Sequence, residues 1–226
     1  SGIEQNAAEI RDAVDAFSLP PGEQLVFVAY SKGTADLLEA LVRYPDLALR
    51  TAAVVSLAGV VSGSPSAEAT PEFVEKLAEK VFAVKCAPGE GAAIDSLSRS
   101  KRLAWLASNR LPRSVRYYSL AAFADRENIS AVLRPFYDEL AEVDPRNDGQ
   151  VVFHDALVPG GTLLGYLNGD HWAVAVPFGR EHPTLTGPFA TRNEFPREVL
   201  LEAVARFVEE ELLAAAEISP RACPDP

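Results

Sequence analysis

A serine placed between an apolar run and a helical pattern is the feature that most constrains this chain. Residues 25–28 are consecutively apolar, and after Ser31 the apolar residues of 35–42 recur at helical spacing. This pattern predicts a strand, a tight turn and a helix. A serine at the tip of such a turn stands above the sheet edge, where the first helical turn offers free backbone N–H groups to an anion. The segment is therefore a candidate site for nucleophilic chemistry.

Small residues flank this serine on both sides. Ala29 lies two positions before Ser31 and Gly33 two positions after it, which leaves room for a strained turn and for a helix close to the strand. The stretch resembles the nucleophile elbow of the α/β-hydrolase superfamily, with alanine in place of the usual first glycine. The alternative is a simple helix N-cap, in which the Ser31 side chain accepts a backbone N–H bond.

Further apolar runs alternate with helical patterns along the chain. Segment 51–61 is too apolar for a half-exposed strand, so we expect a buried parallel strand there. Segments 114–123 and 161–167 are also expected to be strands. Together with the resemblance, this alternation implies an α/β fold: a three-layer α/β/α sandwich with a mostly parallel sheet, the α/β-hydrolase fold. Helices are predicted at residues 3–17, 34–44, 127–143 and 195–216, the last packed on the sheet.

The domain organisation follows from the same pass along the chain. We expect an α/β-hydrolase core over 1–216, a helical insertion at about 64–113 that is a candidate lid, and a disordered tail at 217–226. Ser64 and Ser66, in the turn after the strand, either line a pocket or serve the turn alone. Trp105 in the insertion either contacts substrate or, as aromatic residues at helical spacing usually do, packs in the core.

Two later stretches complete the pattern that Ser31 begins. Asp148 lies in an Asn-Asp-Gly turn, and His171 follows the last predicted strand in a Gly-Asp-His loop. The chain order of nucleophile, acid and base is the order of the α/β-hydrolase fold. The resemblance therefore implies a catalytic triad of Ser31, Asp148 and His171, with the backbone N–H of Lys32 donating to the oxyanion.

These assignments have alternatives. The alternative is that Asp148 only forms an Asx turn and that Asp144 or Asp155 is the acid instead. His154 and His182, the other two histidines of the chain, are interpreted as structural or solvated.

The remaining reactive residues point to no further chemistry. Lys32 and Asp36 are spaced i, i+4 and are expected to form a surface ion pair rather than to act in catalysis. Cys86 and Cys223 are far apart and are interpreted as incidental. No glycine loop for phosphates and no His/Cys cluster with metal-ligand spacing occurs, so no cofactor and no metal are expected.

Charge and hydropathy limit the partners. The net charge of −11 argues against nucleic acid and against an anionic membrane surface. No apolar run reaches the roughly 18 residues that predict a transmembrane helix. The expected partner is a small-molecule or lipid ester, while the oligomeric state and the localisation stay open.

The resemblance implies a serine hydrolase, similar to lipases and carboxylesterases, that cleaves carboxylic esters through an acyl-enzyme. An acyltransferase or a thioesterase on the same triad is an alternative, and so is a catalytically silent interaction domain. The family takes a second oxyanion donor from a loop after an earlier strand, but only 30 residues precede Ser31. Since the chain also contains no methionine, we expect it to be the C-terminal part of a larger hydrolase, or to need another segment that completes its sheet.

Overall fold

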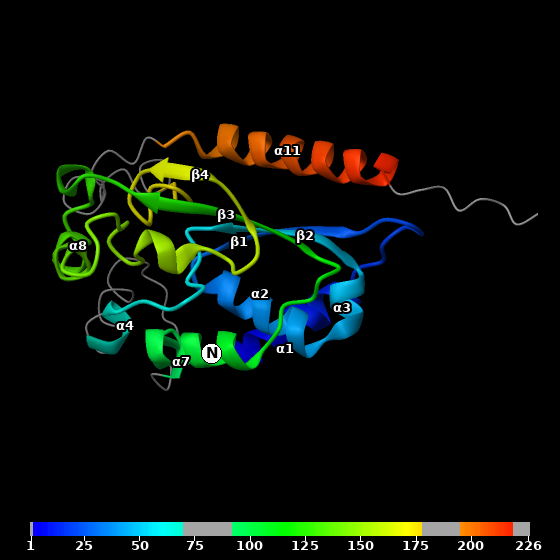
Figure 1. Cartoon of the computed structure of the whole chain (residues 1–226), viewed down its shortest axis with the longest axis horizontal. Coiled ribbons are helices and arrows are strands. Elements are labelled where there is room, and N and C mark those ends of the chain that lie inside the picture. The colour runs from blue at the N-terminus through cyan, green and yellow to red at the C-terminus, as the bar shows by residue number, and fades with distance from the viewer. Residues whose placement is uncertain (1, 70–91, 178–194, 219–226) are drawn as a thin grey trace, which may run out of the picture. The chain divides into compact units, whose positions relative to one another are not determined.

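A computed structural model of the chain describes residues 2–69, 92–177 and 195–218 (Figure 1). These residues belong to two compact units, which divide between Phe195 and Pro196 and are described separately. The first unit contains a four-stranded sheet in the order β1-β2-β3-β4, and every neighbouring pair of strands is parallel. The predicted α/β class is thus confirmed. The strands are β1 (Leu25–Tyr30), β2 (Thr51–Leu57), β3 (Arg116–Phe123) and β4 (Thr162–Asn168).

The pattern of burial explains why these segments form strands. Every residue of β2 except the last is buried, as expected for a parallel strand covered on both faces. In β1 the exposed Val26 and Val28 alternate with Leu25 and Phe27, which pack on the core. One face of β1 therefore packs on the core while the other is more exposed.

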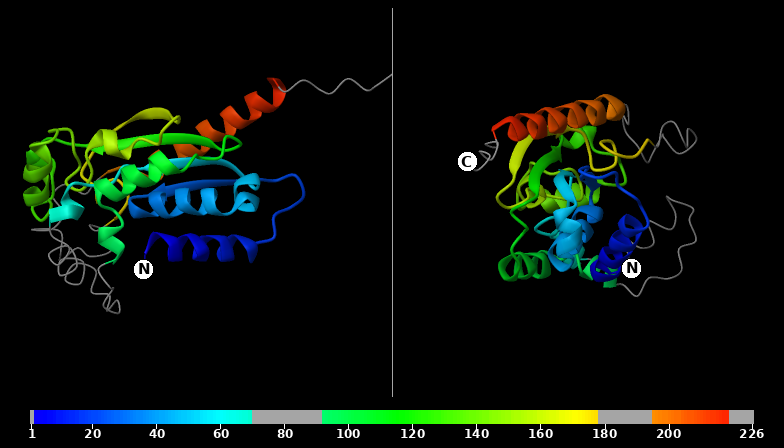
Figure 2. Two further views of the ribbon diagram at one scale, coloured as in Figure 1. Left: turned by 60° about the horizontal axis from the view of Figure 1, so that its bottom comes forward. Right: turned by 90° about the vertical axis from the view of Figure 1, so that its right-hand side faces the viewer.

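Helices α1, α2 and α3 lie along one face of the sheet (Figures 1 and 2). One hydrophobic cluster joins them to the strands, with Val14 from α1, Leu38 from α2 and Val54 from β2 among its members. The helical periodicity of the sequence therefore identified the buried faces correctly. The helices of this unit are α1 (Ile3–Asp15), α2 (Lys32–Arg43), α3 (Pro45–Leu49), α4 (Ser66–Ala69), α6 (Ala92–Asp95), α7 (Arg99–Ser108) and α8 (Arg134–Ala141), with 3-10 turns η1 (Arg126–Asn128) and η2 (Phe153–Ala156).

The helix predicted at 127–143 is shorter than expected. It begins only at Arg134, and η1 precedes it as a separate turn. Pro135 lies in the first turn of α8, the part of a helix in which its missing N–H costs nothing. The proline therefore marks the start of the helix.

The described part of the predicted insertion packs on the core. Trp105 in α7 contacts the cluster shared by α1 and α2, and the Arg102 guanidinium lies 4.5 Å from the centre of its ring. Of the two roles considered for Trp105, substrate contact and core packing, the structure shows core packing. Residues 70–91 lie outside the described ranges, so the role of the insertion as a lid stays a prediction.

The second unit contains the helix α11 (Arg197–Ile218), close to the predicted helix at 195–216. Its packing on the sheet and the domain bounds stay predictions. The tail from 219, both cysteines and His182 lie outside the described residues. Within the described ranges, no helix is both long enough and apolar enough to cross a membrane.

Candidate active site

Ser31 occupies the sharp turn between β1 and α2. Its backbone has φ 53° and ψ −130°, a strained conformation for a residue other than glycine that costs about 1–3 kcal/mol. Backbone bonds to the loop after β2 hold it there: the Ser31 N–H donates to the carbonyl of Leu57 at 3.2 Å, and the Val60 N–H donates to the carbonyl of Ser31 at 3.1 Å. Ser31 stands at the N-cap position of α2, but its side chain makes no capping bond. The hydroxyl is thus left for another partner.

The tight approach of α2 to the sheet depends on a glycine in the next loop. A Cβ at Gly59 would lie 2.2 Å from Ser56 Oγ and 2.6 Å from Thr34 Oγ1, which is far inside van der Waals contact. Thr34 in turn donates its hydroxyl to the carbonyl of Ala29 at 3.0 Å, joining the first turn of α2 to the end of β1. At Gly33, by contrast, a Cβ would meet none of the described atoms within 4 Å. The close approach of α2 to the sheet therefore requires a glycine at position 59. The expectation that Gly33 provides this room was wrong.

The structure brings Ser31, His171 and Asp148 into one line of hydrogen bonds. His171 Nε2 lies 2.8 Å from Ser31 Oγ, and His171 Nδ1 lies 2.7 Å from Asp148 Oδ2. Both His171 and Asp148 are 1% exposed. Since a carboxylate only accepts hydrogen bonds, Nδ1 carries a proton, and Nε2 of the neutral ring accepts from the Ser31 hydroxyl.

Asp148 combines two of the roles considered for it. Its Oδ1 accepts the backbone N–H groups of Gln150 at 2.9 Å and Val151 at 2.7 Å, which is an Asx-type turn. This leaves Oδ2 for the imidazole. The turn follows α8, so a long excursion after β3 delivers the carboxylate.

A tyrosine that sequence reasoning overlooked connects the elbow to the histidine loop. The Tyr30 hydroxyl donates to the backbone carbonyl of His171 at 2.6 Å, and the two rings lie 5.0 Å apart between centres. Burial, with the nearby carboxylates of Asp148 and Asp170, raises the pKa of Tyr30 well above its usual value. The hydroxyl therefore stays protonated and able to donate.

Asp170 anchors the same loop from the other side. Its Oδ2 accepts from both the N–H and the hydroxyl of Ser130, and its Oδ1 accepts the Ala173 N–H at 2.7 Å. The Asp170 side chain is fully buried. The Gly-Asp-His sequence drew attention to the histidine, but nothing in it identified Ser130, which lies 40 positions away.

The other candidate acids and histidine lie elsewhere. Hydrogen bonds from Arg146 lower the pKa of Asp144 to about 2. Asp155 pairs with Arg99 at 3.3 Å, and burial is the main cause that raises its pKa. His154 lies next to that pair, 3.4 Å from Arg99 Nη2. The hydrogen bonds and ion pairs described for Asp144, Asp155 and His154 do not involve Ser31 or His171.

The ion pair between Lys32 and Asp36 is more buried than predicted. Lys32 Nζ lies 2.6 and 2.9 Å from the two carboxylate oxygens, but Asp36 is only 5% exposed and also accepts from Asn6 Nδ2 of α1 at 2.8 Å. The pair therefore stabilises the packing of α1 on α2, and the expected surface location was wrong. Lys32 is also the first residue of α2, so its backbone N–H has no partner inside the helix.

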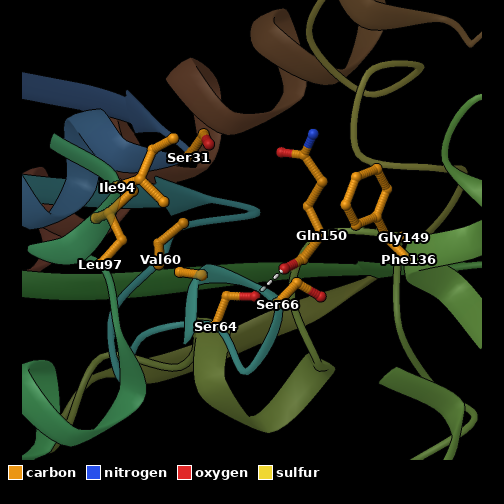
Figure 3. A pocket seen from close by; sticks show the side chains of 10 residues that line it. Ser31, Val60, Ser64, Ser66, Ile94, Leu97, Phe136, Gly149 and Gln150 are labelled. Carbon is orange, nitrogen blue, oxygen red and sulfur yellow. Dashed lines mark hydrogen bonds between the residues drawn. The ribbon is translucent and has the colours of Figure 1, made fainter. Parts of the chain in front are cut away.

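A cavity of about 110 Å³ adjoins Ser31 (Figure 3). Its described wall is mainly apolar and includes Val60, Ile94, Leu97 and Phe136. Ser64 and Ser66 both belong to this wall, although the backbone of Ser64 also closes a turn by accepting the Ala67 N–H. The part of the chain that the structure describes holds no group of three or more His, Cys, Asp and Glu residues that could bind a metal ion.

Comparison with known proteins gives a consistent picture. No protein-family model matches the chain, and no curated protein matches it. Among solved structures, it is similar to the metagenomic carboxyl esterase MGS0156, with 55% identity over 93% of this chain and a TM-score of 0.83. The chain spans 63% of the length of that esterase.

Two more distant structures share the fold. The mature lipase BlEst2 of Bacillus licheniformis is 21% identical, with a TM-score of 0.59 over 82% of this chain and 75% of its own. The Staphylococcus hyicus lipase is 10% identical, with a TM-score of 0.60 over 86% and 72%. The parallel sheet, the strained serine turn and these likenesses agree. The chain has the α/β-hydrolase fold and is similar to a carboxyl esterase.

Proposed function

We propose that this protein is a carboxylic ester hydrolase that works through an acyl-enzyme on Ser31. The observation that carries the proposal is the continuous line of hydrogen bonds from Ser31 Oγ through His171 to Asp148. The 55% identity to a carboxyl esterase supports esters as the substrate class. A partly exposed serine backed by a buried histidine and a buried carboxylate supplies the groups that acyl transfer needs.

The proposed mechanism assigns one role to each group. Ser31 Oγ attacks the ester carbonyl carbon while its proton passes to His171 Nε2, since a serine hydroxyl alone is a weak nucleophile. Asp148 holds the ring in the productive tautomer and stabilises its protonated form. The Lys32 N–H donates to the tetrahedral oxyanion, and a donor of this kind contributes about 2.7–4 kcal/mol to lowering the barrier.

The remaining steps return the enzyme to its starting state. The C–O bond to the alcohol breaks, and His171 transfers its proton to the departing oxygen. A water molecule then attacks the acyl group with His171 again as the base, which releases the acid and restores the Ser31 hydroxyl. The apolar cavity beside Ser31 is suited to hold the acyl chain during both steps.

Labelling with a fluorophosphonate tests the proposal directly. The wild type is expected to react at Ser31, and Ser31→Ala and His171→Ala are expected to remain unlabelled. His154→Ala is a matched histidine control that should label like the wild type, because His154 contacts Arg99 and not the serine. A wild type that does not react would leave the silent interaction domain as the better hypothesis. Labelling that survives Ser31→Ala would rule out Ser31 as the nucleophile.

Product analysis separates the hydrolase from its enzymatic alternatives. With p-nitrophenyl esters in water we expect the free acid, and added alcohols or thiols should not compete strongly for the acyl group. Predominant transfer to the added acceptor would indicate an acyltransferase. Faster turnover of matched thioesters would indicate a thioesterase.

A further inference from the structure

The hydroxyl of Ser66 is a buried polar group in the wall of the cavity beside Ser31. Ser66 is 7% exposed, and its Oγ has no hydrogen-bond partner among the described residues. Figure 3 shows its side chain in the same cavity wall as Val60 and Ser64. A buried donor without a partner is unfavourable, so such a group in a ligand cavity calls for an explanation.

Ser64 provides the internal comparison. It lies two residues earlier in the same wall, but its Oγ donates to the backbone carbonyl of Gln150 at 2.5 Å. The protein itself therefore uses the Ser64 hydroxyl to hold the loop that follows Asp148. The Ser66 hydroxyl has no such task.

The surroundings of Ser66 offer few groups that could satisfy it. The described wall is mostly apolar, with Val60, Leu97 and Phe136 among its members. Gln150 contributes an amide side chain to the wall, and in Figure 3 its amide group is directed away from Ser66. The missing acceptor is best supplied by a ligand.

We propose that Ser66 is a specificity-determining residue that donates a hydrogen bond to an oxygen atom within the acyl chain of the substrate. The inference rests on the proposed function, because a covalent bond to Ser31 places the acyl chain beside this wall. A pure hydrocarbon chain would bury the Ser66 hydroxyl without a partner. An acyl chain with an ether, keto or second ester oxygen would satisfy it, and a site built to bond such a group discriminates against an analogue that lacks it.

Esters with equal chain length provide the test. p-Nitrophenyl hexanoate is compared with its ether analogues 4-methoxybutanoate and 3-ethoxypropanoate, which have the same number of chain atoms and an oxygen remote from the scissile carbonyl. For the wild type, kcat/KM is expected to be about tenfold higher for the better ether ester than for hexanoate. In Ser66→Ala this ratio should fall to about one, with the ether ester slower and hexanoate as fast or faster.

Two further variants show whether the effect belongs to the Ser66 hydroxyl. Ser66→Cys keeps the size of the side chain with a weaker donor, so an intermediate ratio is expected. Ser64→Ala should slow both esters by the same factor, because its hydroxyl holds Gln150 and not the substrate. Thermal unfolding of Ser66→Ala should occur at the wild-type temperature or above, since the variant removes an unpaired buried group.

The outcomes separate this inference from the proposed function. If the wild type hydrolyses the esters but its ratio is the same in Ser66→Ala, the specificity role of Ser66 is wrong and the hydrolase stands. If Ser64→Ala changes the ratio as strongly as Ser66→Ala, the preference does not arise from the unpaired hydroxyl. If the wild type neither hydrolyses any of the esters nor labels at Ser31, the proposed function itself fails.

Discussion

The hydroxyl of Tyr30 donates a hydrogen bond to the backbone carbonyl of His171 across 141 positions of sequence. Tyr30 directly precedes the candidate nucleophile, and His171 is the candidate base. Through this bond the elbow that displays the serine also holds the loop that displays the histidine. The relative position of the two reacting groups therefore depends on one side chain as well as on the sheet.

Tyr30→Phe tests this connection. It leaves the buried carbonyl of His171 without its donor, so the free energy of unfolding should fall by about 1–3 kcal/mol. We expect kcat to fall by about tenfold, equivalent to about 1.4 kcal/mol of barrier, with little change in KM. Urea unfolding and steady-state kinetics measure the two effects.

Tyr117→Phe is the matched control, because the buried Tyr117 hydroxyl has no partner among the described residues and its loss should not destabilise the protein. Equal effects in both variants would contradict a positioning role for Tyr30.

Asp170→Asn should disturb the histidine loop more strongly. All three bonds to this carboxylate come from donors, two of them on Ser130, so an amide NH2 would face a donor in place of an acceptor. We expect a loss of about 2–3 kcal/mol in unfolding free energy and a lower kcat. Ser130→Ala removes the hydroxyl but keeps the backbone donor, so its effect should be smaller. A Ser130→Ala variant as impaired as Asp170→Asn would argue against this account.

A pair of glycine substitutions tests the packing behind the serine. Gly59→Ala would place a methyl group 2.2 Å from Ser56 Oγ, so it should either prevent folding or lower the free energy of unfolding by about 1–3 kcal/mol. Gly33→Ala meets no described atom within 4 Å and should be neutral or stabilise α2 by up to about 1 kcal/mol. Thermal unfolding and the yield of folded protein distinguish the two. The reverse order of effects would show that the elbow is crowded at Gly33 instead.

Asp148→Asn tests the acid of the proposed triad. An amide in place of the carboxylate favours the wrong tautomer of His171, so kcat should fall by about 10⁴-fold while the folded structure is retained. Asp144→Asn is the matched control, because Asp144 bonds Arg146 and should leave kcat near the wild-type value. A large loss of kcat in Asp144→Asn with activity kept in Asp148→Asn would reverse the assignment.

The low pKa of Asp144 predicts how the stability of the protein changes in acid. Hydrogen bonds from Arg146 lower its pKa to about 2 in the folded protein, below the value of about 3.9 for an unperturbed aspartate. The ion pair therefore contributes to stability above about pH 4, and that contribution disappears as the pH falls towards about 2. Because the pair is largely solvated, the effect should be small. Thermal midpoints between pH 2 and 6 should decline less steeply in Asp144→Asn than in the wild type, and parallel profiles would contradict the assignment.

Local patterns explain what could be predicted. Short segments of consecutive residues contain the apolar runs of β1 and β2 and the helical spacing of α2. The strands, the turn and the helix could therefore be predicted directly. The order of Ser31, Asp148 and His171 identified three residues that the structure brings within hydrogen-bond distance. Ser31 and His171 follow the carboxyl ends of β1 and β4, whereas α8 lies between β3 and Asp148.

The sequence thus predicted most of the strands and helices from their periodicity, which is a local property, and its resemblance to the α/β-hydrolases implied the parallel sheet and the three candidate residues. The tertiary structure alone decided how those residues are held. The Tyr30 bond to His171, the Asp170 bonds to Ser130 and the contact of Gly59 with Ser56 and Thr34 join segments whose spacing follows no local pattern. The unpaired hydroxyl of Ser66 and the burial of Asp36 likewise exist only after packing, since exposure and hydrogen-bond satisfaction are properties of the folded chain.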